Sequence, residues 1–223
     1  MGHGKVNMEK TPTSVLLVTP HQDDAEGGCG GIVAKWAMNG AKVVYVLCTN
    51  GDKGSNDPSM TSVELAKIRE IEQQKAADVL GVEEIVFLRH PDGELEDTYD
   101  VRAEVVREIR RHKPEIVMCL DPFRRISHSH RDHRISGLLA LDAVFTYSWS
   151  PHHFPDQITN EGLSPHRVSQ MYFWGSELSD TYFDISETLD LKIAALAEHE
   201  SQMPKLEEIR ARTIRRAENT GEN

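Results

Sequence analysis

The amino-acid sequence predicts an α/β fold, in which helices cover both faces of a mostly parallel β-sheet. Two observations predict it. Short apolar, β-branched runs alternate with longer segments of helical periodicity. Reactive side chains also gather in the loops after those runs, as at the carboxyl edge of a parallel sheet. The length of 223 residues suits one domain, which we expect at 14–223 after a mobile arm at 1–13.

Two short apolar runs predict the first two strands. Residues 14–19 read SVLLVT and residues 41–49 read AKVVYVLCT, as expected for strands buried on both faces. The segment GGIVAKWAMNG at 30–40 lies between them and predicts a helix. Gly40 ends that helix, because glycine readily adopts the left-handed conformation of a C-terminal cap.

The clearest helix signal lies at 62–81. Ser62 is the expected N-cap, apolar residues recur at helical spacing, and Gly81 is the expected stop. The apolar run EEIVFLRH at 83–90 then predicts a third strand.

A further helix and a further strand are predicted next. The segment 99–113 predicts a helix with three valines and Ile109 on one face, and PEIVMCLDP at 114–122 predicts a fourth strand. The loop FRRISHSHRDH at 123–133 leads into a helix at 134–147.

The regular alternation of predicted strands and helices ends after Trp149. Residues 150–166 are irregular and rich in proline and histidine. Beyond them we expect a strand at 169–176, a short strand at 181–187, a helix at 188–203 and a polar terminal helix at 205–223.

Charge and cysteine usage restrict the class of protein. The net charge of −11 argues against nucleic acid or an anionic membrane as the main partner. The three cysteines, Cys29, Cys48 and Cys119, are far apart, which favours free thiols in a reducing compartment. No apolar run approaches the ~18 residues of a membrane span, and the first residues lack the apolar core of a secretory signal. We therefore expect a cytoplasmic protein.

Four loops after predicted strands carry most of the reactive residues in the first 135 positions. They contain PHQDDAE, TNGDKG, HPDGE and DPFRRISHSHRDH. Within them, His21 and Asp24 are three residues apart, as are His130 and His133. Two histidines and one carboxylate form a three-ligand set that leaves a position open for water, as in catalytic zinc sites. Non-haem Fe²⁺ uses the same ligand set, so the ligand types do not choose the metal.

Asp23 lies beside a candidate ligand, and adjacent carboxylates repel each other unless a cation is close. A metal would relieve that repulsion and leave Asp23 free to accept a proton from an attacking water. His130 would lie across the site, with Asp132 close enough to help hold an imidazolium charge there. This combination predicts metal-assisted hydrolysis of a carbonyl compound. The glycines of GGCGG do not have dinucleotide-binding spacing, and we expect them to pack a helix on the sheet.

Five motifs in order resemble the LmbE-like (PIG-L) family of zinc-dependent N-acetylglucosamine deacetylases. They are PHQDDAE with GCGG, TNGDKG, IREIEQQKAADVLGV, HPDGEL and HRDHR, within a match from about Val15 to Gln202. The resemblance implies a Rossmann-like three-layer sandwich and an enzyme that removes an acetyl group from a small amino-sugar substrate. It also implies a homo-oligomer, a trimer or a hexamer.

The resemblance assigns roles to matching positions. His21 and Asp24 would be zinc ligands and Asp23 the general base. His133 would be the third ligand, and His130 would polarise the carbonyl and stabilise the oxyanion.

Further positions would serve the substrate. Arg69 and Asp92 fall where relatives contact the sugar, and His199–Gln202 resembles a late motif near the site. The sequence also departs from the family pattern, since Gln22 and Arg131 replace frequent prolines and the chain ends where relatives continue. We expect the loop at 150–166 to select the group attached to the sugar.

Two other functions fit parts of the pattern. A metal-dependent phosphoesterase could use the aspartate pair and RDHR, although such sites commonly bind two metals. A non-catalytic sugar- or metal-binding protein would have no use for the base Asp23.

Overall fold

The computed structural model describes residues 10–127, 129–203 and 205–221. The predicted arm therefore lies largely outside the described residues. Its described end is tied down, because the backbone N–H of Thr13 donates to Oε2 of Glu115 over 2.8 Å.

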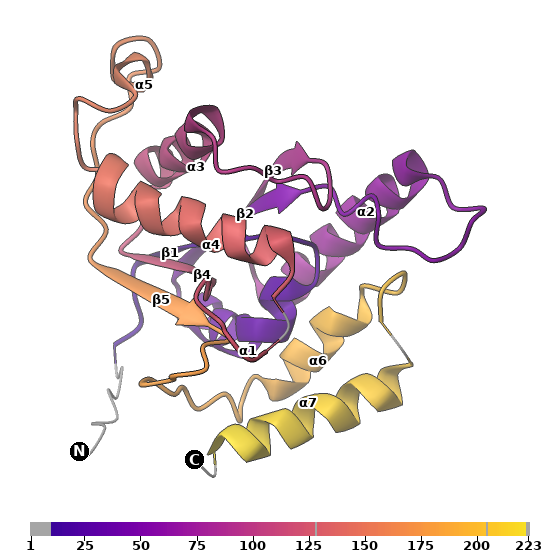
Figure 1. The fold of residues 1–223 in the computed structure, drawn as a ribbon. Helices are drawn as coiled ribbons and strands as arrows, with labels where there is room; N and C mark the ends of the chain where they lie inside the picture. Colours follow the sequence, from indigo (N-terminus) through magenta and orange to yellow (C-terminus); the bar gives the residue numbers. More distant parts are fainter. Residues whose placement is uncertain (1–9, 128, 204, 222–223) are drawn as a thin grey trace.

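Five parallel strands form one sheet in the order β3-β2-β1-β4-β5, which confirms the predicted fold class (Figure 1). Each strand coincides with a predicted one to within two residues at either end. They are β1 (Ser14–Thr19), β2 (Lys42–Thr49), β3 (Glu84–His90), β4 (Ile116–Leu120) and β5 (Gln170–Trp174).

The strand predicted at 181–187 is wrong, because those residues form no strand. Their apolar side chains pack on the helix after β1 instead. The ring of Phe183 lies 5.5 Å from that of Trp36, and Ile185 fills the space beside Gly31. These contacts partly bury Phe183 and Ile185 without extending the sheet.

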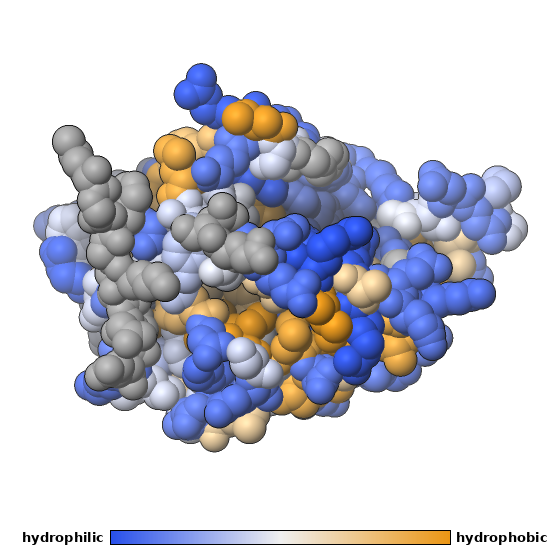
Figure 2. Space-filling view, turned by 90° about the horizontal axis from the view of Figure 1, so that it is seen from below, coloured by the Kyte–Doolittle hydropathy of each residue, from blue (hydrophilic) through white to orange (hydrophobic). Residues whose placement is uncertain are grey.

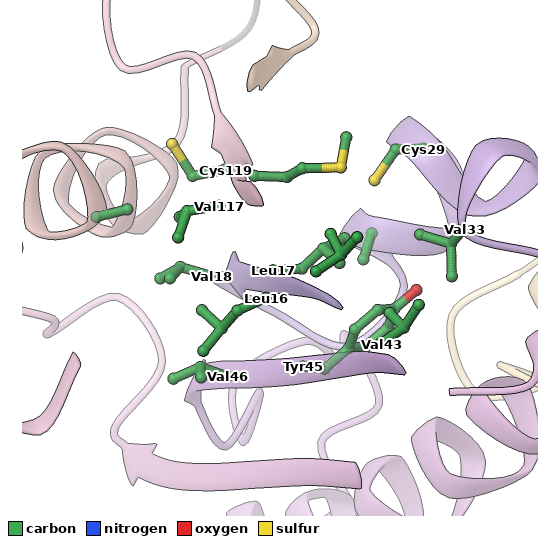
Figure 3. Packing of buried hydrophobic residues seen from close by; sticks show 14 of the residues in the cluster. Leu16, Leu17, Val18, Cys29, Val33, Val43, Tyr45, Val46, Val117 and Cys119 are labelled. Carbon is green, nitrogen blue, oxygen red and sulfur yellow. The ribbon is translucent and has the colours of Figure 1, made fainter. Parts of the chain in front are cut away.

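The central strand β1 is buried on both faces, as its continuous apolar run predicts. Leu16, Leu17 and Val18 are fully buried, and Val15 is level with Val43 of β2 and Ile116 of β4. Figure 3 shows these side chains packing against neighbouring strands and the helix that carries Val33. The core therefore holds the end of β1 rigidly in place.

Helices cover both faces of the sheet. In Figure 1, α3 and α4 lie over one face and α1 and α2 over the other, with α6 and α7 as a further layer outside α1 and α2. Their bounds are α1 (Asp24–Met38), α2 (Ser62–Leu80), α3 (Tyr99–His112), α4 (Arg131–Asp142), α5 (Pro155–Thr159), α6 (Leu189–Ala197) and α7 (Leu206–Gly221); a π-helical turn, η1 (Ala143–Tyr147), continues α4.

Helix α1 begins at Asp24, six residues before the predicted start. The glycine run is therefore helical despite its low helix propensity, because tertiary packing requires small residues there. A Cβ at Gly28 would lie 2.2 Å from the ring of Trp174, and one at Gly31 would lie 2.6 Å from Ile185. These contacts support the packing role expected for the glycines.

The N-cap of helix α2 lies one residue before Ser62, the predicted cap. Thr61 is the N-cap and forms a reciprocal capping box with Glu64, while Gly81 ends the helix in the left-handed conformation as predicted.

The segment 150–166 lies at the amino edge of the sheet, on the side of α5 in Figure 1. The fully buried guanidinium of Arg110 holds it by donating to five backbone carbonyls and the Gln157 side chain. The Nε2 of His166 also lies 2.7 Å from the carbonyl oxygen of Pro114, just before β4. The residues predicted to form the active site follow the strands and therefore lie at the carboxyl edge of the sheet. The expectation that the 150–166 loop selects the substrate is therefore wrong for the active site of the same chain.

The surface is mainly hydrophilic on the side of α7, with some apolar side chains between the polar ones (Figure 2). Among the described residues, no helix is both long enough and apolar enough to cross a membrane. The three cysteines are all buried free thiols.

Candidate metal centre

The candidate site lies where the chain leaves β1, β3 and β4 at the carboxyl edge. Strand β1 lies between β2 and β4, so the strand order reverses at this point. The helices after β1 and β4 cover opposite faces, and such a reversal opens a crevice at the strand ends. The turn before α1 supplies His21 and Asp23, and the start of α4 supplies His130 and His133.

The three predicted metal ligands meet at one carboxylate oxygen. Oδ2 of Asp24 lies 3.0 Å from Nδ1 of His21 and 3.2 Å from Nε2 of His133. Burial raises the pKa of Asp24, but hydrogen bonds to His133 and His21 outweigh burial and lower it. Asp24 is therefore ionised at neutral pH, which is the state that binds a cation.

His21 joins three carboxylates. Its Nδ1 faces Asp24, while its Nε2 lies 3.1 Å from Asp92 and 3.2 Å from Asp132. Burial lowers the pKa of His21, but hydrogen bonds to Asp132, Asp24 and Asp92 outweigh burial and raise it to about 11. Without a cation, a protonated His21 is therefore the counter-charge of these carboxylates.

The donor set fits a zinc ion. At zinc–nitrogen distances of about 2.0–2.1 Å, the ligand atoms of a tetrahedral site lie about 3.3 Å apart. The two contacts of Asp24 differ from that separation by only a few tenths of an ångström. A carboxylate behind the second nitrogen of His21 is also what metal-bound histidines commonly have.

Two overlapping groups of possible ligands occur in the described part of the chain. The ligand atoms within each group lie within 4.8 Å of one another. One group is His21, His130 and His133, and the other is His21, Asp92, His130 and Asp132. His130 and Asp92 thus lie beside the predicted ligand set.

Arg124 contacts a predicted ligand and was missed by the sequence reasoning. Its Nη2 lies 3.1 Å from Nδ1 of His133. A guanidinium only donates, so Nδ1 is the acceptor in this contact, and Nε2 is the ring nitrogen that faces Asp24. The only sequence feature that could have indicated a role for Arg124 is the pair of adjacent arginines in FRRIS, in the loop after β4.

Asp23 has the environment of a general base. Its backbone is left-handed, with φ of 93°, and its Oδ2 lies 3.9 Å from Nη2 of Arg69. Burial and the neighbouring charge of Asp24 raise the pKa of Asp23 to about 7, against the opposing charges of Arg69 and His199. A carboxyl group titrating near neutral pH can both accept and return a proton.

His130 is positioned by the start of α4. As the N-cap of that helix, its Nδ1 accepts the backbone N–H of Asp132 over 3.2 Å. Burial and the charge on His21 lower the pKa of His130. Because Nδ1 accepts in this contact, Nε2 is the ring nitrogen that can donate a hydrogen bond.

Asp132 is fully buried and lies closer to His21 than to His130. Its Oδ2 is 3.2 Å from Nε2 of His21 and 3.9 Å from Nδ1 of His130. It also accepts the backbone N–H groups of Gly93 and Leu95, and thereby ties the loop after β3 to α4.

Arg69 and Asp92 lie beside the site, where their predicted role in sugar binding stays a prediction. Arg69 is buried and donates to the carbonyl oxygens of Gly51 and Gln22, which joins the loops after β2 and β1. Asp92 contacts Nε2 of His21.

Comparison with known proteins agrees with this fold. A model of the PIG-L family, described as GlcNAc-PI de-N-acetylase, matches residues 16–144. The chain is 37% identical to diacetylchitobiose deacetylase of Thermococcus kodakarensis over 191 residues, which are 86% of this chain and 70% of that protein. The structure of the N,N'-diacetylchitobiose deacetylase of Pyrococcus horikoshii is similar, with a TM-score of 0.85 and 32% identity over 91% of this chain and 75% of that one.

Fold alone is shared more widely. The 4-carboxy-2-hydroxymuconate hydratase GalB of Pseudomonas putida KT2440 has a TM-score of 0.75 at 23% identity, over 91% of this chain and 83% of that one. The two diacetylchitobiose deacetylases are the more informative relatives, and with them the fold and site define an N-deacetylase. The chain belongs to the PIG-L family.

Proposed function

We propose that this protein is a zinc-dependent hydrolase that removes the N-acetyl group from an N-acetylglucosamine-type sugar or sugar conjugate. One observation carries the proposal: Asp23 adjoins a carboxylate, Asp24, on which two imidazoles from separate segments converge. The likeness to two diacetylchitobiose deacetylases supports the amino-sugar substrate.

His21, Asp24 and His133 would hold the zinc ion. When bound there, it would polarise the acetyl carbonyl and lower the pKa of water from its bulk value towards about 7. Fe²⁺ fits the same donor set, so the metal has to be identified by analysis of the purified protein.

Asp23 moves the proton. Its carboxylate takes a proton from the attacking water while the water oxygen bonds to the acetyl carbon. The Nε2–H of His130 donates to the oxyanion that forms, while the backbone N–H of Asp132 holds the ring through Nδ1. Asp23 then returns the proton to the amine nitrogen as the carbon–nitrogen bond breaks, releasing acetate and the amino sugar.

The remaining roles complete the proposal. Arg69 and Asp92 would bind sugar hydroxyls beside the site, and the enzyme would act as a cytoplasmic homo-oligomer. The oligomer can be tested by measuring the mass of the purified protein in solution.

An amine-release assay tests the proposed function. Zinc-loaded enzyme is given free N-acetylglucosamine, diacetylchitobiose, thiol- and lipid-linked conjugates, and a phosphate ester. We expect amine release from at least one of the sugars and no release of phosphate from the phosphate ester. Asp23→Asn should lower kcat by about 10²–10⁴-fold while keeping one zinc per chain. Near-normal turnover by Asp23→Asn, or phosphate release alone, would contradict the proposal.

A further inference from the structure

A buried glutamate–histidine pair lies behind Asp23. Glu26 on α1 and His199, just after α6, are both fully buried. Oε2 of Glu26 lies 3.5 Å from Nε2 of His199, and its Oε1 accepts a hydrogen bond from Gln73 of α2 over 2.9 Å. The Glu26 carboxylate therefore joins α1 to two other segments.

His199 depends on Glu26 as its counter-charge. Within the described part of the chain, neither ring nitrogen of His199 makes a hydrogen bond at ordinary distance. Burial lowers the pKa of His199, but the carboxylate of Glu26 outweighs burial and raises it. Removing two charges from water is costly, and an apolar pair of the same volume is often as stable. A contribution to the stability of the fold therefore does not by itself explain why this pair is present.

The pair lies one helical turn from a strained backbone position. Asp23 is not glycine, yet its φ is 93°, and its side chain makes no capping hydrogen bond. Such a conformation is unfavourable for a residue other than glycine and persists only where the surroundings enforce it. Glu26 lies in the first turn that follows, in which the backbone N–H of Gly27 donates to the carbonyl of Asp23 over 2.9 Å.

The segment that carries His199 is itself held in place. The backbone N–H and the hydroxyl of Ser201 both donate to Glu72 of α2, over 2.8 and 2.7 Å. On the other side of Asp23, Arg69 of α2 donates to the carbonyl of Gln22 over 2.8 Å. Helix α2 thus supports both the residue before Asp23 and the segment that carries His199.

We propose that His199 is a positioning residue that acts through Glu26 to hold the first turn of α1, and with it the reactive conformation of Asp23. His199 is fully buried, and in the described part of the chain its ring forms no hydrogen bond or ion pair with a predicted metal ligand. The inference rests on the proposed deacetylation, because Asp23 is the base of that reaction.

A double-mutant cycle with diacetylchitobiose and zinc-loaded enzyme tests the inference. His199→Ala and Glu26→Gln should each lower kcat about 10- to 100-fold and change KM by less than about threefold. The kcat of the double variant should be no lower than that of the slower single variant, because both substitutions remove the same contact between Glu26 and His199. Independent effects that multiply, or an unchanged kcat in His199→Ala, would overturn the proposal.

A matched control removes a similar pair far from the site. Glu108 and His112 lie 3.4 Å apart on α3, at the amino edge of the sheet. His112→Ala should lower stability and leave kcat unchanged; an equal loss of kcat would mean that general loosening explains the result. If His199→Ala does not fold, His199→Gln keeps the volume and an N–H for Glu26, and should retain most of kcat. A kcat for His199→Gln as low as that of Glu26→Gln would overturn the proposal.

Zinc affinity separates this inference from the proposed function. Asp24 follows Asp23, so loosening the turn should weaken zinc binding about tenfold in His199→Ala, with one zinc per chain at saturation. Metal competition measures this without substrate. If the wild type deacetylates none of the sugars, the proposed function fails, and weakened zinc binding still supports the positioning role. Unchanged affinity overturns it.

Discussion

Nε2 of His21 lies 3.2 Å from Oδ2 of Asp132, although 111 residues separate them along the chain. The contact joins the turn after β1 to the first turn of α4, across the crevice between the two faces of the sheet. It places a buried carboxylate behind a predicted metal ligand, where it fixes the tautomer and orientation of the imidazole.

Asp132→Asn should therefore weaken zinc binding about 10- to 100-fold. The amide cannot supply the negative charge behind His21, and only one of its two polar atoms can accept the N–H groups of Gly93 and Leu95. Competition with a metal chelator measures the affinity. Asp142→Asn at the other end of α4 is the control and should bind zinc as the wild type does. Equal affinity for Asp132→Asn and wild type would contradict this role.

His133→Ala should remove the bound metal, because only two of the three proposed ligands would remain. Elemental analysis of the purified protein gives the metal per chain. His166→Ala is a suitable control, since His166 contacts the carbonyl of Pro114 at the opposite edge of the sheet. A full complement of metal in His133→Ala would exclude His133 as a ligand.

Two glycine substitutions on one helix should have opposite effects on stability. Gly28→Ala should lower the free energy of unfolding by about 1–3 kcal/mol, because a Cβ there overlaps Trp174. Gly27→Ala meets its nearest neighbour, Leu196, only at 4.0 Å and should raise stability by roughly 0.5–1 kcal/mol through helix propensity. Urea unfolding measures both. Equal stabilisation by the two changes would show that Trp174 yields easily.

The His90–Glu104 pair should stabilise the fold most below neutral pH. Nε2 of His90 lies 2.6 Å from Oε2 of Glu104, and this hydrogen bond raises the pKa of His90 against the effect of burial. The stabilisation is complete below the unfolded value of about 6.5 and disappears as pH rises through the raised folded value. The wild type should therefore exceed Glu104→Gln in urea resistance by more at about pH 6 than at about pH 9.

An arginine pair gives the control for that pH dependence. Arg107 and Glu161 are 2.8 Å apart, and a guanidinium stays charged over this whole range. The difference between wild type and Glu161→Gln should stay constant between the two pH values. A constant difference for Glu104→Gln as well would show that His90 does not titrate there.

The sequence predicted the sheet well, because short apolar strands buried on both faces leave a strong signal. All five strands fall where the runs predicted them, and Gly81 ends α2 as expected. The start of α1 could not be predicted in the same way. Gly27 and Gly28 argue against a helix locally, and the side chain that accounts for Gly28 is Trp174, which lies far along the chain.

The edge occupied by the 150–166 segment could have been predicted. The segment follows a helix and precedes a parallel strand, so the alternation itself returns it to the amino edge. The contacts of Arg124 with His133 and of His199 with Glu26 are different. They join residues from separate elements, and a single sequence contains no periodic signal for such pairs.

The spacing of the proposed ligands along the chain also has a consequence for biosynthesis. His21 and Asp24 leave the ribosome more than a hundred residues before His133, and in the folded chain β4, which pairs with β1, precedes the helix that carries His133. A nascent chain that ends before α4 can present one half of the site alone. If His21, Asp24 and His133 bind a metal as proposed, its loading would require the crossover that connects the two halves of the sheet.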